Sequence, residues 1–350
     1  MTRARTLLGV LLTGALLVTA TAYVLWRRGE AAAVRDGLRL RLDRHGTVVY
    51  VDRDRVRQLT PRGAAVGDGP TCGRAATARS TLICVRARPG PLSAQAAQVR
   101  VYTGGARDPK VTLPVWGAPS RARVAPSGHL VTWTVFRTGD SYAVPGRFST
   151  TAGIYDLRDR HHYGSLEDFE PFVDGERYRE QDVNFWGVTF AADDRTFYAT
   201  MASKGRTWLM RGDLVRRTLT AVRRNVECPS LSPDGRRIAY KKRTDQGRWR
   251  LHVLRLGGGP AARGDGGGPA VRGDGGGPAA RGDGGGPAVR GDVALAETAH
   301  VDDQPAWLDD DTLAYARPVD GTPTLFTVPA DGSGRPHRLA AGSSPTPATG

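Results

Sequence analysis

The stretch Pro229–Tyr240, which reads PSLSPDGRRIAY, decides the fold. Pro233 presets φ for the second position of a type I turn, Asp234 can bond to its own backbone, and Gly235 tolerates a positive φ. Ile238 and Tyr240 lie two residues apart and therefore fall on one face of the strand that follows. The stretch predicts a strand, a tight turn and a second strand.

Weaker copies of this hairpin recur along the chain. Aligned on Tyr240, the matching residues are Tyr50, Cys84, Trp133, Ala199, Tyr240 and Tyr315. The gaps between them are 34, 49, 66, 41 and 75 residues, and the last becomes 39 without a 36-residue insertion. A four-stranded propeller blade needs roughly 40–45 residues. The repeats therefore predict an all-β fold, a six-bladed β-propeller, with a long excursion in the 66-residue gap. A β-sandwich with irregular strand spacing is the alternative.

An apolar segment precedes the repeats. Leu7–Trp26 carries no charge, is long enough to span a bilayer as a helix, and is followed by Arg27-Arg28. Ala20-Thr21-Ala22 also matches the small-residue pattern of a signal-peptidase site. Residues 1–34 are therefore interpreted as a single N-terminal helix with a short linker, either a signal peptide cleaved after Ala22 or a retained transmembrane anchor. Both alternatives place the propeller outside the cytoplasmic membrane, anchored or secreted.

The propeller is expected over residues 35–340, with a flexible tail at 341–350. Within it, Gly257–Asp292 consists of four tandem nonapeptides, Gly-Gly-Gly-Pro-Ala-(Ala/Val)-Arg-Gly-Asp. The array has no aromatic residue and no period that could bury a face, so it is predicted to be a disordered insertion in a blade hairpin. Its Arg-Gly-Asp copies invite an adhesion hypothesis, but replication slippage explains the same repeats without a function.

The chain is strongly basic, with a formal net charge of +15. This charge favours attraction to an acidic surface such as anionic lipid or a cell-wall polymer. Of the 50 basic residues 46 are arginine, a bias that GC-rich coding also produces, so solvated strand faces are the simpler explanation. Nucleic acid is not an expected partner, because the N-terminal segment directs the propeller away from the cytoplasm. We expect a monomer.

Three cysteines bear on the compartment. Cys72 and Cys84 flank the second hairpin, where adjacent antiparallel strands can bring them within bridging distance. A disulfide there would suit an oxidising exterior. Two small apolar residues buried in neighbouring strands explain the pair equally well. Cys228 is interpreted as a buried strand residue, and these spacings make no zinc site.

Aromatic residues gather in the long excursion and just after it. They are Phe169, Phe172, Phe185 and Trp186. Exposed aromatic residues anchor interfaces, so these four are candidates for a partner-binding rim. Filling the gap between two blades is the alternative. Linear catalytic motifs are absent from the sequence, and we assign no catalytic, cofactor-binding or metal-binding residue.

The Ser-Pro-Asp-Gly-x-x-Ile-Ala-Tyr hairpin at Ser232–Tyr240 resembles the repeat of the TolB-like β-propeller proteins, a WD40-like repeat. Partial matches lie at Ala125–Trp133 and Trp307–Tyr315, and the resemblance extends over roughly residues 36–340. The chain is more similar to the exported TolB-like proteins of high-GC bacteria than to TolB itself, whose α/β domain ahead of the propeller is expected to have no counterpart here. The resemblance implies a six-bladed propeller outside the cytoplasmic membrane that serves as a protein-interaction platform.

Function is therefore expected to be non-enzymatic binding of a protein or an anionic envelope component, without a cofactor. Two alternatives stay open. One is a propeller lyase or hydrolase with an active site in the channel. The other is an accessory or sensor subunit that binds an acidic ligand through the arginine-rich blades.

Overall fold

The computed structural model describes residues 39–88, 96–137, 149–257 and 289–349, together with positions 14, 16, 18, 19 and 21–23. The chain divides into two compact units, Met1–Arg39 and Leu40–Gly350. The described positions between 14 and 23 are helical. Within the described part of the chain, no helix is long and apolar enough to cross a membrane. Most of the predicted signal peptide or anchor lies outside the described residues.

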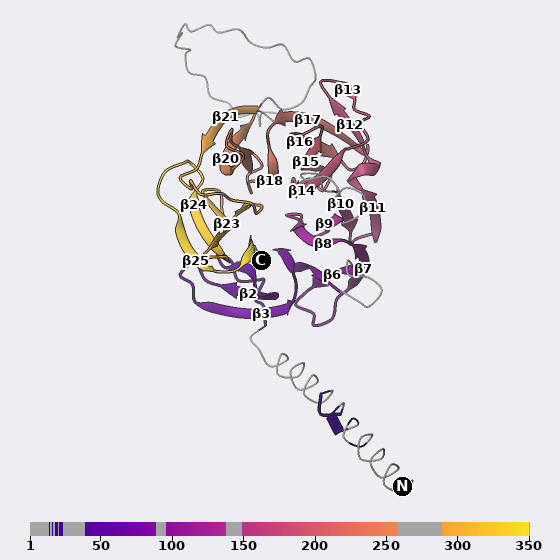
Figure 1. Cartoon of the computed structure of the whole chain (residues 1–350), viewed down its shortest axis with the longest axis vertical. Coiled ribbons are helices and arrows are strands. Elements are labelled where there is room, and N and C mark those ends of the chain that lie inside the picture. The colour runs from indigo at the N-terminus through magenta and orange to yellow at the C-terminus, as the bar shows by residue number, and fades with distance from the viewer. Residues whose placement is uncertain are drawn as a thin grey trace, which may run out of the picture. The chain divides into compact units, whose positions relative to one another are not determined.

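The described strands of Leu40–Gly350 form six sheets that are arranged as blades around a common centre (Figure 1). From the innermost strand outward, blade 1 is β26 (Ser343–Pro347), β1 (Val48–Asp52), β2 (Arg55–Leu59) and β3 (Ala65–Thr71); blade 2 is β4 (Arg74–Ala78), β5 (Thr81–Ala87), β6 (Ala96–Thr103) and β7 (Val111–Trp116); and blade 3 is β8 (Ala118–Val124), β9 (Leu130–Arg137), β10 (Ser149–Asp156) and β11 (His161–Ser165). Blade 4 is β14 (Asn184–Phe190), β15 (Thr196–Ser203), β16 (Arg206–Asp213) and β17 (Thr218–Arg224), extended by β12 (Glu170–Val173) and β13 (Glu176–Arg177); blade 5 is β18 (Glu227–Leu231), β19 (Arg237–Arg243), β20 (Trp249–Leu256) and β21 (Val289–Ala294); and blade 6 is β22 (Ala306–Trp307), β23 (Thr312–Val319), β24 (Thr322–Pro329) and β25 (His337–Ala341). The predicted six-bladed β-propeller is confirmed.

The hairpin repeat corresponds to the same place in every blade. All six aligned residues lie in the second strand from the centre and are at most 8 % exposed. In the best copy, Gly235 has φ +69° and its N–H donates to the Ser232 carbonyl at 2.9 Å. The Arg236 N–H donates to Asp234 Oδ1 at 3.0 Å, which is the local bond expected of an aspartate in a turn.

The core lies between neighbouring blades. One cluster joins Leu130 and Ile154 of blade 3 to Phe197 and Met210 of blade 4. In blade 5, Ile238 is completely buried in a cluster that also holds Tyr198 of blade 4. Each blade therefore buries its faces against its neighbours, as the repeat predicts.

The predicted flexible tail at 341–350 is wrong. Ser343–Pro347 forms β26, the innermost strand of blade 1, and Val48 of β1 is the register partner of Pro347. The Thr77 hydroxyl of blade 2 donates to the Pro347 carbonyl at 3.0 Å. The sequence did not predict this strand, because its five residues include two prolines and no large apolar residue and therefore show no alternating pattern.

The predicted boundary of the insertion is also wrong. Residues 258–288 lie outside the described ranges, but the last four residues of the final repeat begin β21, which pairs with β20. Asp292 ends the repeat array, and its side chain is only 18 % exposed. The array therefore supplies a strand residue of blade 5.

Candidate functional site

The 66-residue gap builds a feature that the other blades lack among the described residues. After β11, the 3₁₀ helix η1 (Leu166–Asp168) starts from a capping box in which Ser165 Oγ accepts from Glu167 N and Asp168 Oδ2 accepts from Ser165 N. The chain then forms β12, which runs parallel to β17 on the outer edge of blade 4. Asp174 and Gly175 both have positive φ and turn the chain into β13.

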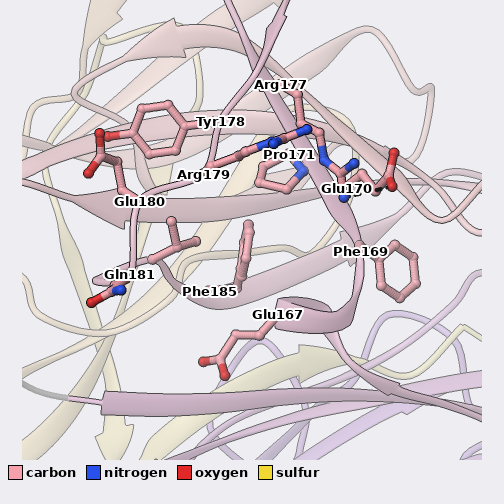
Figure 2. A pocket seen from close by; sticks show the side chains of 11 residues that line it. Glu167, Phe169, Glu170, Pro171, Arg177, Tyr178, Arg179, Glu180, Gln181 and Phe185 are labelled. Carbon is pink, nitrogen blue, oxygen red and sulfur yellow. Dashed lines mark ion pairs between the residues drawn. The ribbon is translucent and has the colours of Figure 1, made fainter.

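This excursion and the chain leading into β14 line an open pocket with a volume of about 620 Å³ (Figure 2). The lining residues are Glu167, Phe169, Glu170, Pro171, Arg177, Tyr178, Arg179, Glu180, Gln181, Val183 and Phe185. Among the lining residues, Pro171, Val183 and Phe185 are apolar, and we call these three the pocket floor. Figure 2 shows charged side chains around Pro171 and Phe185. The combination of an apolar surface and a few polar groups is typical of a binding site.

Three of the charged side chains that line the pocket are already paired. Arg177 Nη2 lies 2.8 Å from Glu170 Oε1, and Lys204 Nζ lies 2.6 Å from Glu180 Oε1. Glu167 and Arg179 form no ion pair within the described residues. Burial raises the pKa of the Glu167 carboxyl, although nearby Arg137 opposes the increase. The pocket thus offers one carboxylate and one guanidinium that are available to a ligand.

The wall formed by residues 178–183 is held in place by the loop after β15. The Tyr178 hydroxyl donates to Ser203 Oγ at 3.0 Å, and the Ser203 hydroxyl donates to Asp182 Oδ1. The Lys204 N–H donates to Asp182 Oδ2 at 2.6 Å. The bond from Ser203 lowers the pKa of Asp182, so this carboxylate stays charged and keeps its partners at neutral pH.

The structure corrects the predicted aromatic rim. Phe169, Phe185 and Trp186 are 3 %, 1 % and 7 % exposed, and Phe172 is half-buried. Phe169 packs edge-on against Phe197 with ring centroids 6.0 Å apart. Three of the four are therefore buried rather than projecting from the rim, and Phe169 and Phe185 belong to the core cluster between blades 3 and 4. Two of them, Phe169 and Phe185, nevertheless reach the pocket lining.

Sequence reasoning missed the polar residues of the pocket. Glu167 lies in the long excursion, and Arg179, Glu180 and Gln181 form an unbroken polar run near its end. That polar run between two predicted strands was the available signal. It did not show which side chains would converge, because the parallel pairing of β12 with β17 joins segments almost 50 residues apart.

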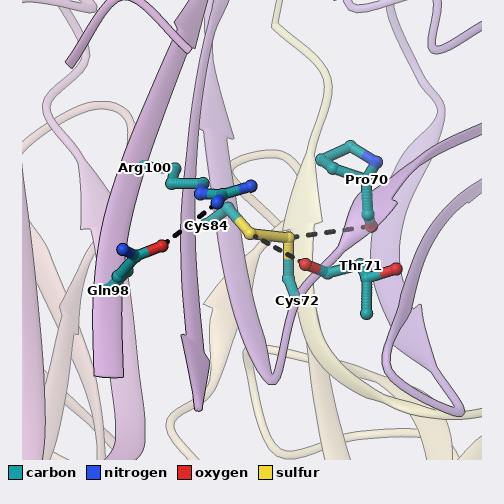
Figure 3. Close-up of a disulfide and its surroundings, with 6 residues drawn as sticks. All are labelled: Pro70, Thr71, Cys72, Cys84, Gln98 and Arg100. Carbon is teal, nitrogen blue, oxygen red and sulfur yellow. Dashed lines mark hydrogen bonds between the residues drawn. A yellow bond between two sulfur atoms is a disulfide. The ribbon is translucent and has the colours of Figure 1, made fainter. Parts of the chain in front are cut away.

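Cys72 and Cys84 are joined by a disulfide, with their Cα atoms 5.4 Å apart (Figure 3). Beside the bond, the Arg100 guanidinium donates to Gln98 Oε1 at 3.1 Å. Cys228 is a free thiol and is completely buried. In the described ranges, no group of three or more His, Cys, Asp or Glu side chains is placed to hold a metal ion.

Comparison with known proteins addresses the fold. No family model and no curated protein matches the sequence. TolB from Acinetobacter baumannii superposes with a TM-score of 0.55 at 15 % identity, covering 87 % of this chain and 67 % of that one. The putative TolB from Agrobacterium tumefaciens gives 0.44 at 13 % identity over 85 % and 90 % of the two chains. A puromycin-hydrolysing peptidase from Mycobacterium tuberculosis gives 0.39 at 12 % identity over 76 % and 37 %.

By the arrangement of its blades, the protein is a six-bladed β-propeller. The superposition on TolB identifies its fold as TolB-like, as the Ser232–Tyr240 repeat predicted. Identities this low define the fold alone.

Proposed function

We propose that the protein is a non-enzymatic binding platform outside the cytoplasmic membrane and that the pocket of blade 4 receives a segment of a partner protein. The observation that carries the proposal is the pocket itself. One blade departs from the repeat, and the departure lines an open pocket of about 620 Å³ over an apolar floor. The leading apolar segment and the Cys72–Cys84 disulfide support an extracytoplasmic position, because disulfides persist in oxidising compartments.

The charges around the pocket indicate the kind of segment that fits. Pro171, Val183 and Phe185 offer contacts to an apolar side chain. Glu167 complements a basic residue beside that side chain, and Arg179 complements an acidic one. Burial of one apolar side chain supplies roughly 1.5–3 kcal/mol, enough to make the floor the main source of affinity. The proposed ligand is therefore a short protein segment with an apolar anchor flanked by charges of opposite sign.

A crosslinking experiment on the full chain identifies the partner. A photoactivatable residue at Gln181, in the pocket, is compared with one at Arg255, an exposed residue of β20. We expect a protein adduct from position 181 and none of the same mass from position 255. The purified adduct partner then provides the ligand for a binding measurement.

The binding measurement uses a matched pair of variants. Val183→Arg places a charge on the pocket floor. Val215→Arg introduces the same charge outside the pocket, at a residue of blade 4 that is 73 % exposed. We expect Val183→Arg to raise the Kd about tenfold or more and Val215→Arg to leave it unchanged. Equal affinities for the two folded variants would contradict the proposal.

A further inference from the structure

The centre of the ring is crossed by the chain that leads into β22, which we call the central segment (residues 301–305). Arg121 Nη2 of blade 3 donates to the Asp302 carbonyl at 2.9 Å, and Gln304 Nε2 donates to the Pro229 carbonyl of blade 5 at 2.7 Å. The Ser344 N–H of blade 1 donates to Asp303 Oδ2 at 3.4 Å. The central segment belongs to blade 6 and thus contacts the innermost strands β8, β18 and β26 (Figure 1 shows β8 and β18 at the centre).

Two arginines of β8 contact this segment, and a third arginine, Arg74, lies beside them. Arg74 of β4 donates through Nε to the Ser120 carbonyl at 2.7 Å and through Nη1 to Ser343 Oγ at 3.1 Å. Arg123 of β8 donates to the Pro305 carbonyl at 2.5 Å. Arg121 is also in β8, and its Nη1 atom lies 3.7 Å from Asp303 Oδ1. Most of the acceptors are neutral carbonyl and hydroxyl oxygens.

The charges of this cluster do not balance. Of the carboxylates that the structure describes, Asp303 is the one within 4 Å of the three guanidinium groups. Asp302 is bound by Lys241 Nζ at 2.6 Å and acts on Arg121, together with the buried Cys228 thiol, from farther away. The Arg121 and Asp303 side chains are only 11 % and 12 % exposed. A buried charge is unfavourable unless an opposite charge and hydrogen bonds compensate it. The cluster therefore holds more positive charge than its own residues neutralise.

Two further observations agree with an excess of positive charge. Burial lowers the pKa of Arg123 to about 10; Asp303 and Cys228 oppose the decrease, and repulsion by Arg121 adds to it. At Arg121, by contrast, burial is outweighed by Cys228 and Asp303, which hold the pKa above its ordinary value. Burial alone would raise the pKa of Asp303, but Arg121 and Arg74 hold it below its ordinary value. In addition, Arg121 Nε is buried and has no hydrogen-bond partner among the residues described. Among the described residues, one donor of the cluster and one acceptor of the central segment, Gln304 Oε1, are thus without a partner.

We propose that Arg74, Arg121 and Arg123 form a binding site for a small free oxyanion of the phosphate type at the centre of the ring. An oxyanion supplies both the negative charge and the several acceptor oxygens that guanidinium groups bind best. The low exposure of Arg121 and Asp303 selects a compact ion over a phosphate group carried by a polymer or a lipid. This inference is independent of the pocket on blade 4.

Inorganic phosphate is the probe, added to the full chain against potassium chloride at matched ionic strength. Phosphate is expected to raise the Tm saturably and to bind in equilibrium dialysis, because a ligand of the folded state stabilises it by mass action. Arg123→Gln should weaken phosphate binding about tenfold, and Asp303→Asn should tighten it by removing the competing carboxylate. Arg255→Gln, at an exposed arginine of β20, is the matched control and should leave binding unchanged.

Each variant is compared with itself in the presence and absence of phosphate, so a lower starting Tm does not obscure the result. A phosphate effect no larger than that of chloride would overturn the site. The same holds if Arg123→Gln and Arg255→Gln bind phosphate equally well. Glycerol phosphate is the last probe, and binding as tight as that of inorganic phosphate would overturn the restriction to a small free ion.

Discussion

Val49 of the first strand and Thr346 of the last strand are register partners in the same sheet. The ring is thus closed by hydrogen bonds and packing between two segments almost 300 residues apart. Ala348 continues this contact, since it is buried and its N–H donates to the Thr47 carbonyl at 2.9 Å. Closure gives blade 1 its innermost strand and lets blade 2 pack against it.

Truncation after Gly342 removes β26 and should open the ring. We expect a Tm lower by at least about 10 °C, because the loss of one strand exposes apolar surface of both blades 1 and 2. Removal of Thr349 and Gly350 alone is the control and should change the Tm by only a few degrees. Differential scanning calorimetry distinguishes the two, and equal Tm values would refute closure as a source of stability.

Asp292 is expected to be the most sensitive residue of the repeat array. It accepts from the Tyr240 hydroxyl at 2.8 Å and Arg223 Nη2 at 3.1 Å, and Lys242 Nζ lies 2.5 Å away. Asp292→Ala leaves these donors without a carboxylate and should lower the free energy of unfolding by about 3 kcal/mol. Urea unfolding measures the change.

The control for Asp292 is deletion of the first three repeats, residues 257–283. This deletion shortens the chain between Leu256 and Val289 and keeps Asp292 in place. Loop closure then becomes easier, so stability should stay equal or rise by roughly 1–2 kcal/mol. A deletion as damaging as Asp292→Ala would show that the missing repeats contribute contacts of their own.

The same carboxylate predicts a dependence of stability on pH. Burial would raise the pKa of Asp292, but hydrogen bonds from Lys242, Tyr240 and His252 lower it to about 2 from 3.8. A depressed carboxyl pKa stabilises the folded state above the unfolded pKa, and the stabilisation disappears as the pH falls. We therefore expect a loss of roughly 2 kcal/mol between about pH 4 and pH 2. Asp292→Asn should remove this part of the pH profile, and an unchanged profile would contradict the assignment.

Reduction of the disulfide should destabilise the folded protein. Cys72 and Cys84 are 12 residues apart, so the bond restricts a short loop of the unfolded chain and contributes about 3 kcal/mol. The double variant Cys72→Ser/Cys84→Ser should match the reduced protein in urea unfolding. Thiol titration checks the pairing: the oxidised protein should yield one reactive thiol, that of Cys228, and only after unfolding. Three thiols without a reductant would disprove the bond.

Ile238 tests the hairpin that defines the repeat. It is completely buried between blades 4 and 5, so Ile238→Asp places an unpaired carboxylate in the core. The substitution costs several kcal/mol, comparable with the whole stability of a domain, and should abolish cooperative thermal unfolding. Ile238→Val keeps an apolar side chain and should cost only about 1 kcal/mol. Similar Tm values for the two variants would contradict the conclusion that burial of Ile238 stabilises the propeller.

The fold was predictable because its signal is local. Pro233, Asp234 and Gly235 specify a turn, and Ile238 and Tyr240 specify the buried face that follows. These requirements recur in every blade, so even weak copies could be aligned. Strand β26 lacks both features and is defined only by its partner β1. A strand that exists through pairing with a distant segment leaves no local pattern.

The two candidate sites were less predictable for a related reason. The aromatic residues of the excursion were recognised, but alternation alone did not show that Phe169 and Phe185 would be buried. The contact of Arg121 with Asp303 joins an innermost strand to the central segment, 182 positions farther along the chain. Contacts between such distant residues depend on the circular order of the blades, and no local sequence pattern predicts them.

The position of Asp292 at the end of the array has a consequence for variation among strains. Because every unit ends in the same Arg-Gly-Asp, gain or loss of whole units delivers an identical tripeptide to β21. The number of nonapeptide units can therefore change without altering the residues that the array contributes to blade 5. A fluorescent reporter is best inserted among the first three repeats, ahead of the residues that form β21.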